Sequence, residues 1–114
     1  MHIEFKTIDN DYKTFVLEDE EKYILLSYFL STFRSSDLTE FIEMFEEVET
    51  GKKTFEEVWN PNVYLSFGNG SGYIELDKTT AYFFSFSPKT ERNFEMPLKE
   101  LIDIMKRWKA FLGV

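Results

Sequence analysis

The spacing of apolar residues changes twice along this chain, and these changes restrict the folds open to it. Helical spacing over residues 38–48, alternation from residue 63, and helical spacing again over 98–112 follow one another. Apolar side chains at i, i+3, i+4 and i+7 share one face of a helix, whereas alternating ones share one face of a strand. The chain is therefore predicted to place a group of strands between two amphipathic helices.

The middle segment predicts an antiparallel sheet. Strands are expected over 63–67, 73–76 and 80–86, with a glycine-rich loop at 68–72 and a turn at 77–79. Ser87-Pro88 ends the third strand, and residues 92–95 are typical of a short edge strand. Pro97 is expected at the first position of the last helix. The apolar stripe of that helix is Leu98, Leu101, Ile102, Met105, Trp108 and Leu112. Of these, Leu101, Met105 and Trp108 are expected to be buried against the sheet.

The first half predicts a hairpin followed by helices. Strands over 3–7 and 12–17 flank the turn signal Asp9-Asn10-Asp11. Residues 22–34 are apolar nearly all round, so helix and buried strand both remain open, although four preceding acidic residues favour a helix N-terminus. A helix is predicted over 37–50, with Asp37 and Glu40 in a capping box and Gly51 after its end. The expected fold class is α+β, an antiparallel sheet with packed helices and a C-terminal helix closing the core.

Composition limits the chain to a single domain with an aromatic core. Its 114 residues are 43% hydrophobic and include 13 Phe, 6 Tyr and 2 Trp, which is enough to close one core over residues 1–114. Cysteine is absent, so disulfides, thiolate metal sites and a cysteine nucleophile are excluded.

Charge is distributed unevenly along the chain. Residues 1–60 carry a formal charge of −9 and residues 61–114 a charge of +1, which gives the net −8. Nucleic acid and anionic membranes would repel this charge, so a basic protein partner is favoured. The N-terminus resembles no signal peptide and no apolar run could span a bilayer, so a cytoplasmic location is expected.

Motifs for catalysis or cofactor binding are missing. Asp9-Asn10-Asp11 begins like a calcium loop, but Lys13 stands where an acidic ligand is required. The glycine-rich loop lacks the lysine of a phosphate-binding loop. His2 is the only histidine, and the carboxylates lie in runs on expected solvent faces. We therefore predict no enzyme, no cofactor and no metal.

The candidate residues for binding a partner are acidic and aromatic. Glu40, Glu43, Glu46 and Glu47 share the polar side of the 37–50 helix, where basic residues are nearly absent. The alternative without a binding role is an ordinary solvent-exposed helix face, since glutamate is a good helix former. Aromatic residues beside acids make good interface centres, although each is more often part of a core. The full candidate set is Glu18, Asp19, Glu20, Glu21, Glu40, Glu43, Glu46, Glu47, Glu56, Glu57, Trp59, Tyr64, Tyr73 and Tyr82.

The order of segments also carries a resemblance. An acidic helix ends in Glu49-Thr50-Gly51, a β meander follows, and a segment from Met96 to Leu112 that contains the last helix closes the chain. This order resembles small bacterial immunity proteins of contact-dependent growth inhibition and related polymorphic toxin systems. The resemblance implies a cytoplasmic protein that binds a cognate toxin domain and occludes its active site. Many such toxins are nucleases with basic clefts.

Three hypotheses for function follow. The first is an immunity protein, a monomer or small homo-oligomer, whose acidic residues between 18 and 57 steer and contact a basic toxin. The second is a module that holds a small apolar ligand between sheet and helices. The third, an enzyme using carboxylates, is the least supported, because two converging carboxylates in a deep cleft would be needed.

Overall fold

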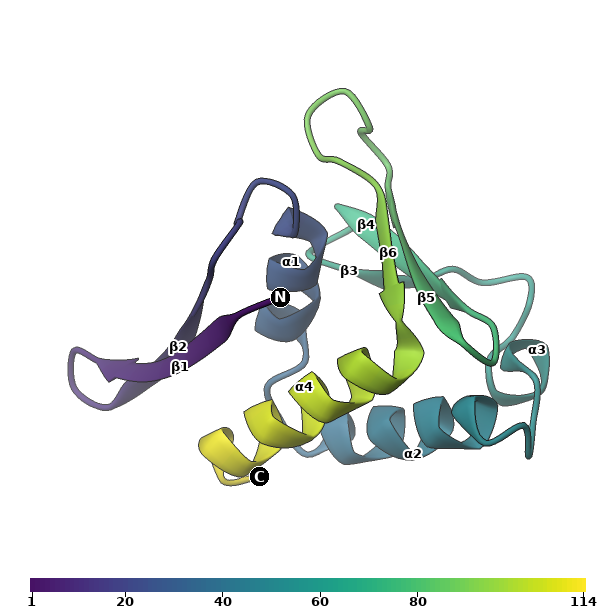
Figure 1. The fold of residues 1–114 in the computed structure, drawn as a ribbon, viewed down its shortest axis with the longest axis horizontal. Coiled ribbons are helices and arrows are strands. Elements are labelled where there is room, and N and C mark those ends of the chain that lie inside the picture. The colour runs from purple at the N-terminus through teal and green to yellow at the C-terminus, as the bar shows by residue number, and fades with distance from the viewer.

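The structure, a computed structural model, describes residues 1–114 as two antiparallel sheets and four helices (Figure 1). The fold is α+β, as predicted. One continuous cluster of 24 buried hydrophobic residues forms the core. The elements are β1 (Ile3–Ile8), β2 (Tyr12–Leu17), α1 (Ile24–Thr32), α2 (Asp37–Glu49), α3 (Phe55–Val58), β3 (Leu65–Phe67), β4 (Gly72–Leu76), β5 (Thr80–Ser85), β6 (Phe94–Pro97) and α4 (Leu98–Leu112).

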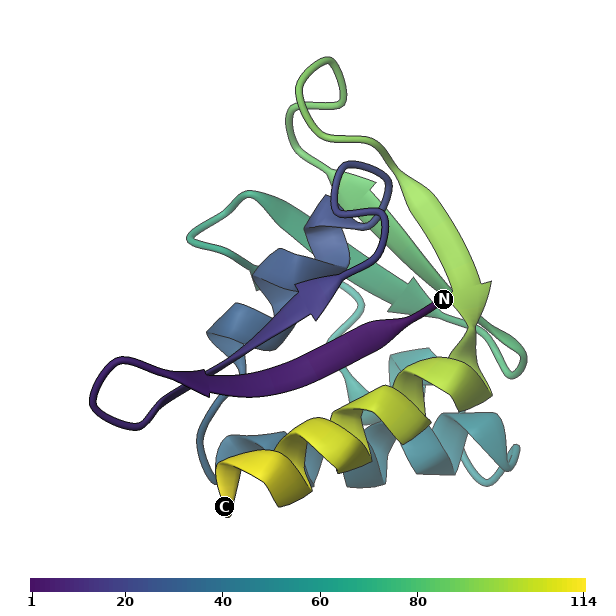
Figure 2. The same cartoon turned by 60° about the vertical axis from the view of Figure 1, so that its left-hand side comes forward.

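Strands β1 and β2 form a separate ribbon at the predicted hairpin. Its turn places Asn10 and Asp11 at positive φ, which these two residue types tolerate better than most. One side of the ribbon lies over the C-terminal half of α4 (Figure 2). There Phe5 and Phe15 contact Trp108. The ribbon thus belongs to the core although it shares no hydrogen bonds with the larger sheet.

The larger sheet has the strand order β3-β4-β5-β6, antiparallel throughout. Strand β3 begins at Leu65 rather than at Val63. Val63 belongs to a turn, in which its N–H bonds the Asn60 carbonyl and its own carbonyl accepts the Trp59 indole N–H. Gly72 opens β4 where a Cβ would lie 2.7 Å from the carbonyl oxygen of Phe84. Only glycine allows this close approach of the two backbones.

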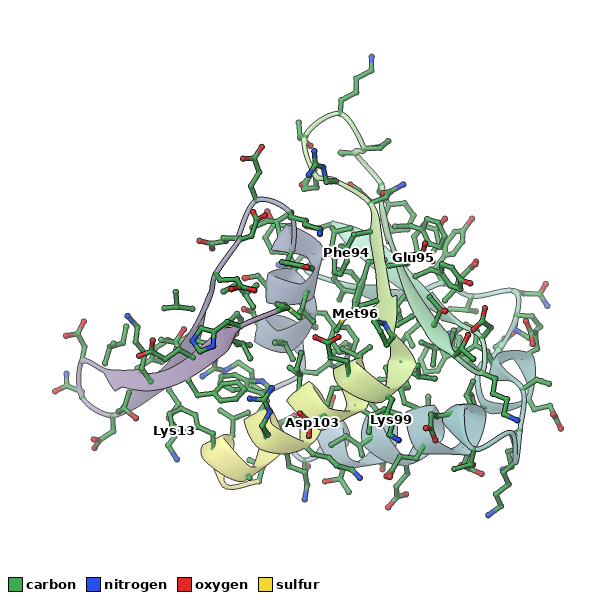
Figure 3. The ribbon with its side chains drawn as sticks, in the orientation of Figure 1. Lys13, Phe94, Glu95, Met96, Lys99 and Asp103 are labelled. Carbon is green, nitrogen blue, oxygen red and sulfur yellow. The ribbon has the colours of Figure 1, made fainter.

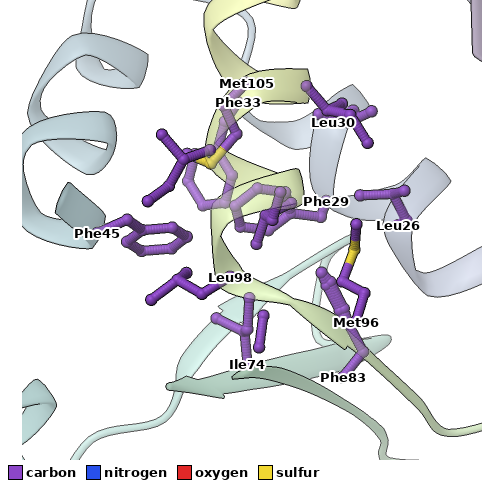
Figure 4. Close-up of a cluster of buried hydrophobic side chains, with 14 of the residues drawn as sticks. Leu26, Phe29, Leu30, Phe33, Phe45, Ile74, Phe83, Met96, Leu98 and Met105 are labelled. Carbon is purple, nitrogen blue, oxygen red and sulfur yellow. The ribbon is translucent and has the colours of Figure 1, made fainter. Parts of the chain in front are cut away.

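Residues 24–32 form a helix and not the alternative strand. Four of its apolar side chains are fully buried. The ring of Phe29 contacts Phe45 on α2 and Phe83 on the sheet (Figure 4), and it also contacts Phe67. A strand would point half of these residues away from the core. The acidic residues 18–21 were expected at the N-terminus of this helix; they form the turn that precedes it, where Asp19 accepts the backbone N–H of Lys22.

The predicted capping box at Asp37 and Glu40 is wrong. Ser36 occupies the N-cap position of α2 and makes no side-chain capping bond. Asp37 is the first residue of the helix, and its carboxylate accepts the Ser35 hydroxyl. The capping box of this chain lies at α3, where Thr54 and Glu57 bond each other's backbone N–H groups. At the other end of α2, Gly51 has φ +79° and terminates the helix as predicted.

Helix α4 runs beside α2 and connects the two sheets (Figures 1 and 2). Pro97 does not open it: Pro97 ends β6 and caps the helix, which begins at Leu98. The N-terminal half of α4 packs on β5 and β6. We expected Trp108 to lie against the same sheet, but its ring packs against the ribbon and its indole N–H bonds the Leu30 carbonyl. No helix of the structure is long and apolar enough to span a bilayer.

Candidate functional site

The outer face of the larger sheet is not covered by any helix. Helices α1 and α4 pack against the inner face, where Leu65, Ile74, Ala81 and Phe83 are buried. Because side chains alternate along a strand, the residues between them point outward. On β5 these outward residues are Thr80, Tyr82 and Phe84, all only half-buried.

The outward aromatic rings touch one another. We name this surface the aromatic patch, made of Tyr64, Tyr73, Tyr82, Phe84 and Phe86. Ring centroids lie 4.4 Å apart for Tyr64 and Tyr73, 5.1 Å for Tyr73 and Phe84, and 4.9 Å for Tyr73 and Phe86. Tyr64 and Phe86 are 60% and 45% exposed. Contiguous exposed apolar surface on a small protein marks an interaction site.

Three carboxylates border the aromatic patch. Glu75 and Glu95 are the strand neighbours of Tyr82 on either side, and Asp77 accepts the Tyr82 hydroxyl at 2.7 Å. Glu95 is exposed between Phe94 and Met96 on β6 (Figure 3). None of the five ion pairs in the structure involves these carboxylates. The patch therefore combines apolar rings with uncompensated negative charge.

Asp77 and Tyr82 perturb each other's titration. The hydrogen bond from the Tyr82 hydroxyl, with the backbone N–H groups of Thr79 and Thr80, lowers the pKa of Asp77. The same hydrogen bond raises the pKa of Tyr82 above its ordinary 10.0. For Tyr73, burial is the first cause of its raised pKa, followed by Tyr64 and Glu75. The raised pKa values keep the hydroxyls of Tyr73 and Tyr82 neutral hydrogen-bonding groups at neutral pH.

We expect Asp77→Asn to bring the pKa of Tyr82 back towards the ordinary tyrosine value while Tyr73 keeps its raised pKa. Asparagine can still accept the Thr79 and Thr80 N–H groups, so the turn should persist. Because the folded pKa of Tyr82 is raised, its contribution to stability is complete below pH 10 and is lost as pH rises through the raised pKa. Titration of tyrosinate absorbance in both proteins checks this; identical curves would contradict the role of the hydrogen bond.

A hollow lies at the edge of the aromatic patch. We name it the edge hollow; its volume is about 170 Å³. Tyr64 belongs to both surfaces, Glu56 and Trp59 come from α3 and the residue after it, and Glu75 comes from β4. The structure thus brings together several sequence candidates from distant parts of the chain. These candidates are Glu56, Trp59, Tyr64, Tyr73 and Tyr82.

The acidic candidates on α2 lie elsewhere and are partly neutralised. Glu46 pairs with Lys106 of α4 at 2.9 Å, and Glu47 pairs with Lys53 at 3.2 Å. Glu40 and Glu43 remain exposed and enter no ion pair. The absence of basic residues within 35–51 is therefore offset by lysines from α4 and from the loop after α2, which only the tertiary structure places there.

The remaining acidic candidates lie apart from both surfaces or have a structural role. Residues 18–21 lie before α1, and Glu18 accepts the backbone N–H of His2. Glu57 belongs to the capping box of α3, and its bond from the Thr54 backbone lowers its pKa. The acidic candidates thus occupy separate regions of the surface and not one face.

Sequence reasoning missed Phe84, Phe86, Glu75, Asp77 and Glu95. A signal was present for the two phenylalanines. Over 81–86, aromatic or apolar residues occupy both faces of the strand, whereas a strand with one solvated face usually alternates apolar and polar residues. A strand apolar on both faces, at a position where only one face can be covered, indicates a binding surface.

Neither metal ligation nor similarity to a known protein accounts for this surface. No group of three His, Asp or Glu side chains is placed to hold a metal ion, and His2 is exposed near the N-terminus. The chain matches no protein-family model, no curated protein and no solved structure. The inference to function therefore rests on the aromatic patch, the charges around it and the order of segments along the chain.

Proposed function

We propose that this protein is a non-catalytic immunity protein that binds a cognate bacterial toxin domain through the aromatic patch and occludes its active site. The observation that carries the proposal is the uncovered sheet face with its touching rings and uncompensated carboxylates. Interface centres are rich in Tyr and other aromatics, which bury large areas at low entropic cost. The resemblance in segment order suggests the class of partner.

Charge supports a basic partner. The protein carries a net −8, and Glu75, Asp77 and Glu95 border the patch without basic partners. Such a field accelerates encounter with a basic surface such as a nuclease cleft, while buried aromatic contacts slow dissociation. The acidic residues would then set the association rate, and the aromatic residues would set the dissociation rate.

The alternative of a small-ligand module has less support. The edge hollow, at about 170 Å³, is smaller than the roughly 300–1,000 Å³ typical of pockets for drug-sized ligands. The hollow between Gly51 and Lys78 reaches about 440 Å³, but polar and charged side chains form most of its lining, whereas ligand pockets are mostly apolar. Between the sheet and the helices, where the ligand of such a module would lie, buried side chains from α1, α2, α4 and the larger sheet pack against one another (Figure 4). A protein surface fits an open, shallow, aromatic site better than a small molecule does.

The test is co-expression with the toxin encoded by the neighbouring reading frame, followed by growth and binding measurements. We expect protection from the toxin and a stable complex of the two purified proteins. Survival without complex formation, or no protection, would contradict the proposal. Native mass spectrometry of the purified protein tests the alternative, because a retained small molecule would favour a ligand-binding module.

Charge reversal on α2 tests whether its glutamates act on the association rate alone. Reversing Glu40, Glu43, Glu46 and Glu47 to Lys is expected to slow association and leave dissociation nearly unchanged. The wild-type association rate should fall with salt, since screening limits these charges to about 10 Å at 0.1 M. The double variant Glu40→Lys/Glu43→Lys is the matched control, because it leaves the Glu46–Lys106 and Glu47–Lys53 pairs intact. Unchanged kinetics in both would make these glutamates an ordinary solvated face.

A further inference from the structure

We propose that the edge hollow receives one lysine or arginine side chain of the protein that binds the aromatic patch. This inference rests on the proposed function and specifies what the partner must present. A long cationic side chain entering beside the patch would fix the register of the complex. The hollow would then discriminate between basic partners, because only a partner with a lysine or arginine at the matching position could fill it.

The sheet register creates the hollow. Strand β3 pairs with β4 only from Leu65 opposite Ile74 to Phe67 opposite Gly72. Strand β4 continues through Glu75 to Leu76, so this end of β4 has β5 on one side and no strand on the other. The segment between α3 and β3 passes beside that free edge, and Trp59 and Tyr64 on this segment complete the wall.

The wall has the chemistry of a site for an organic cation. The aromatic faces of Trp59 and Tyr64 can attract a positive charge electrostatically. Glu56 and Glu75 also line the hollow, and neither enters an ion pair or a side-chain hydrogen bond. No lysine or arginine lines it. The apolar floor at Phe55 and Leu65 suits the methylene stem of a basic side chain whose charged end reaches the carboxylates.

The other acidic hollows differ in this respect. The hollow between α2 and α4 places Lys99 and Lys106 beside Glu46 and Glu49, and Lys106 already pairs with Glu46. The hollow between Gly51 and Lys78 likewise carries lysines together with its carboxylates. Glu56 also lines the hollow between Gly51 and Lys78, beside Lys53 and Lys78, so Glu75 is the carboxylate of the edge hollow that no lysine or arginine of the protein accompanies.

The two tryptophans provide a built-in measurement. The Trp59 indole N–H donates to the Val63 carbonyl at 3.0 Å, and its ring packs on Phe41, so the wall is held in place without a partner. The Trp108 indole N–H donates to the Leu30 carbonyl in the buried core. An N–H correlation spectrum should therefore show two indole signals, of which only the Trp59 signal reports on the hollow.

The experiment is a titration of the full-length protein with two capped tripeptides, glycine-arginine-glycine and its neutral isostere glycine-citrulline-glycine. We expect the arginine peptide to shift the Trp59 indole signal along a saturating curve and to leave Trp108 in place. The citrulline peptide should leave both signals in place. The double variant Glu56→Gln/Glu75→Gln, which keeps side-chain size, should lose the arginine response. The variant Glu40→Gln/Glu43→Gln, with the same charge change on α2, should retain it.

Three results would overturn the inference. They are no shift of Trp59 at tens of millimolar arginine peptide, an equal shift with citrulline, and an undiminished response in Glu56→Gln/Glu75→Gln. The titration needs no toxin, so it can fail while toxin binding succeeds; the proposed function would then stand with an unused hollow. Conversely, a specific arginine response without any complex with the toxin would keep the cation site and overturn the proposed partner.

Discussion

Replacing Trp108 by alanine lowers the free energy of unfolding by about 3–5 kcal/mol, the range for truncating a large buried aromatic. Trp108 is fully buried, and its ring contacts Phe5 and Phe15 of the ribbon and Phe111 of α4. Truncation removes these contacts and leaves the Leu30 carbonyl, in the last turn of α1, without its indole donor. The measurement is urea unfolding followed by circular dichroism.

Trp108→Phe is the informative control. It keeps an aromatic ring between the ribbon and α4 but removes the indole N–H, so its destabilisation should be smaller than that of alanine. If Trp108→Ala leaves the unfolding midpoint nearly unchanged, Trp108 does not fasten the ribbon to α4. In an N–H correlation spectrum of Trp108→Ala, loss of the backbone amide signals of the ribbon alone, with those of the larger sheet retained, would show that the ribbon unfolds on its own.

Under the proposed function, removing two exposed rings of the aromatic patch should weaken toxin binding by at least about 2 kcal/mol, or roughly thirtyfold in Kd. The variant is Tyr64→Ala/Phe86→Ala. Both side chains are largely exposed and contact mainly each other and Tyr73, so stability should change little. We expect most of the loss in the dissociation rate, measured by surface-based kinetics with the purified toxin domain.

Tyr12→Ala provides the matched control. Tyr12 is 53% exposed and lies on the ribbon, away from the patch, so removing it tests the effect of losing an exposed aromatic ring as such. Unchanged toxin affinity in a folded Tyr64→Ala/Phe86→Ala protein would contradict binding at the patch. Loss of binding in the charge-reversed α2 variant alone would move the interface to α2.

Much of the fold follows from local patterns. The ribbon, the three strands of the meander and the two amphipathic helices appear close to their predicted bounds because alternation and helical spacing are properties of neighbouring residues. Differences at element ends have specific causes. The Val63 carbonyl accepts the Trp59 indole N–H, and Val63 lies outside β3. The carboxylate of Asp37, which was expected to cap α2, accepts the Ser35 hydroxyl.

The interpretation of residues 22–34 needed tertiary contacts. A segment that is apolar all round has no period that distinguishes helix from buried strand. The decision depends on what surrounds Phe29, which meets rings from α2 and from both β3 and β5. The same limitation applies to Trp108. Its burial can be predicted from the apolar stripe of α4, but its contacts with the ribbon cannot.

For the candidate site, residue types were readable from the sequence and their grouping was not. Tyr64, Tyr73 and Tyr82 could be named as aromatic residues in a β segment, and the acids could be named as a charged set. The strand register pairs Tyr73 with Phe84, which neighbours Tyr82 on β5, and the segment before β3 brings Tyr64 to Tyr73. The packing of α4 on α2 brings Lys106 to Glu46. Side-chain periodicity reports which face a residue occupies, but pairing between segments distant in sequence decides which residues share a surface and which charges remain unpaired.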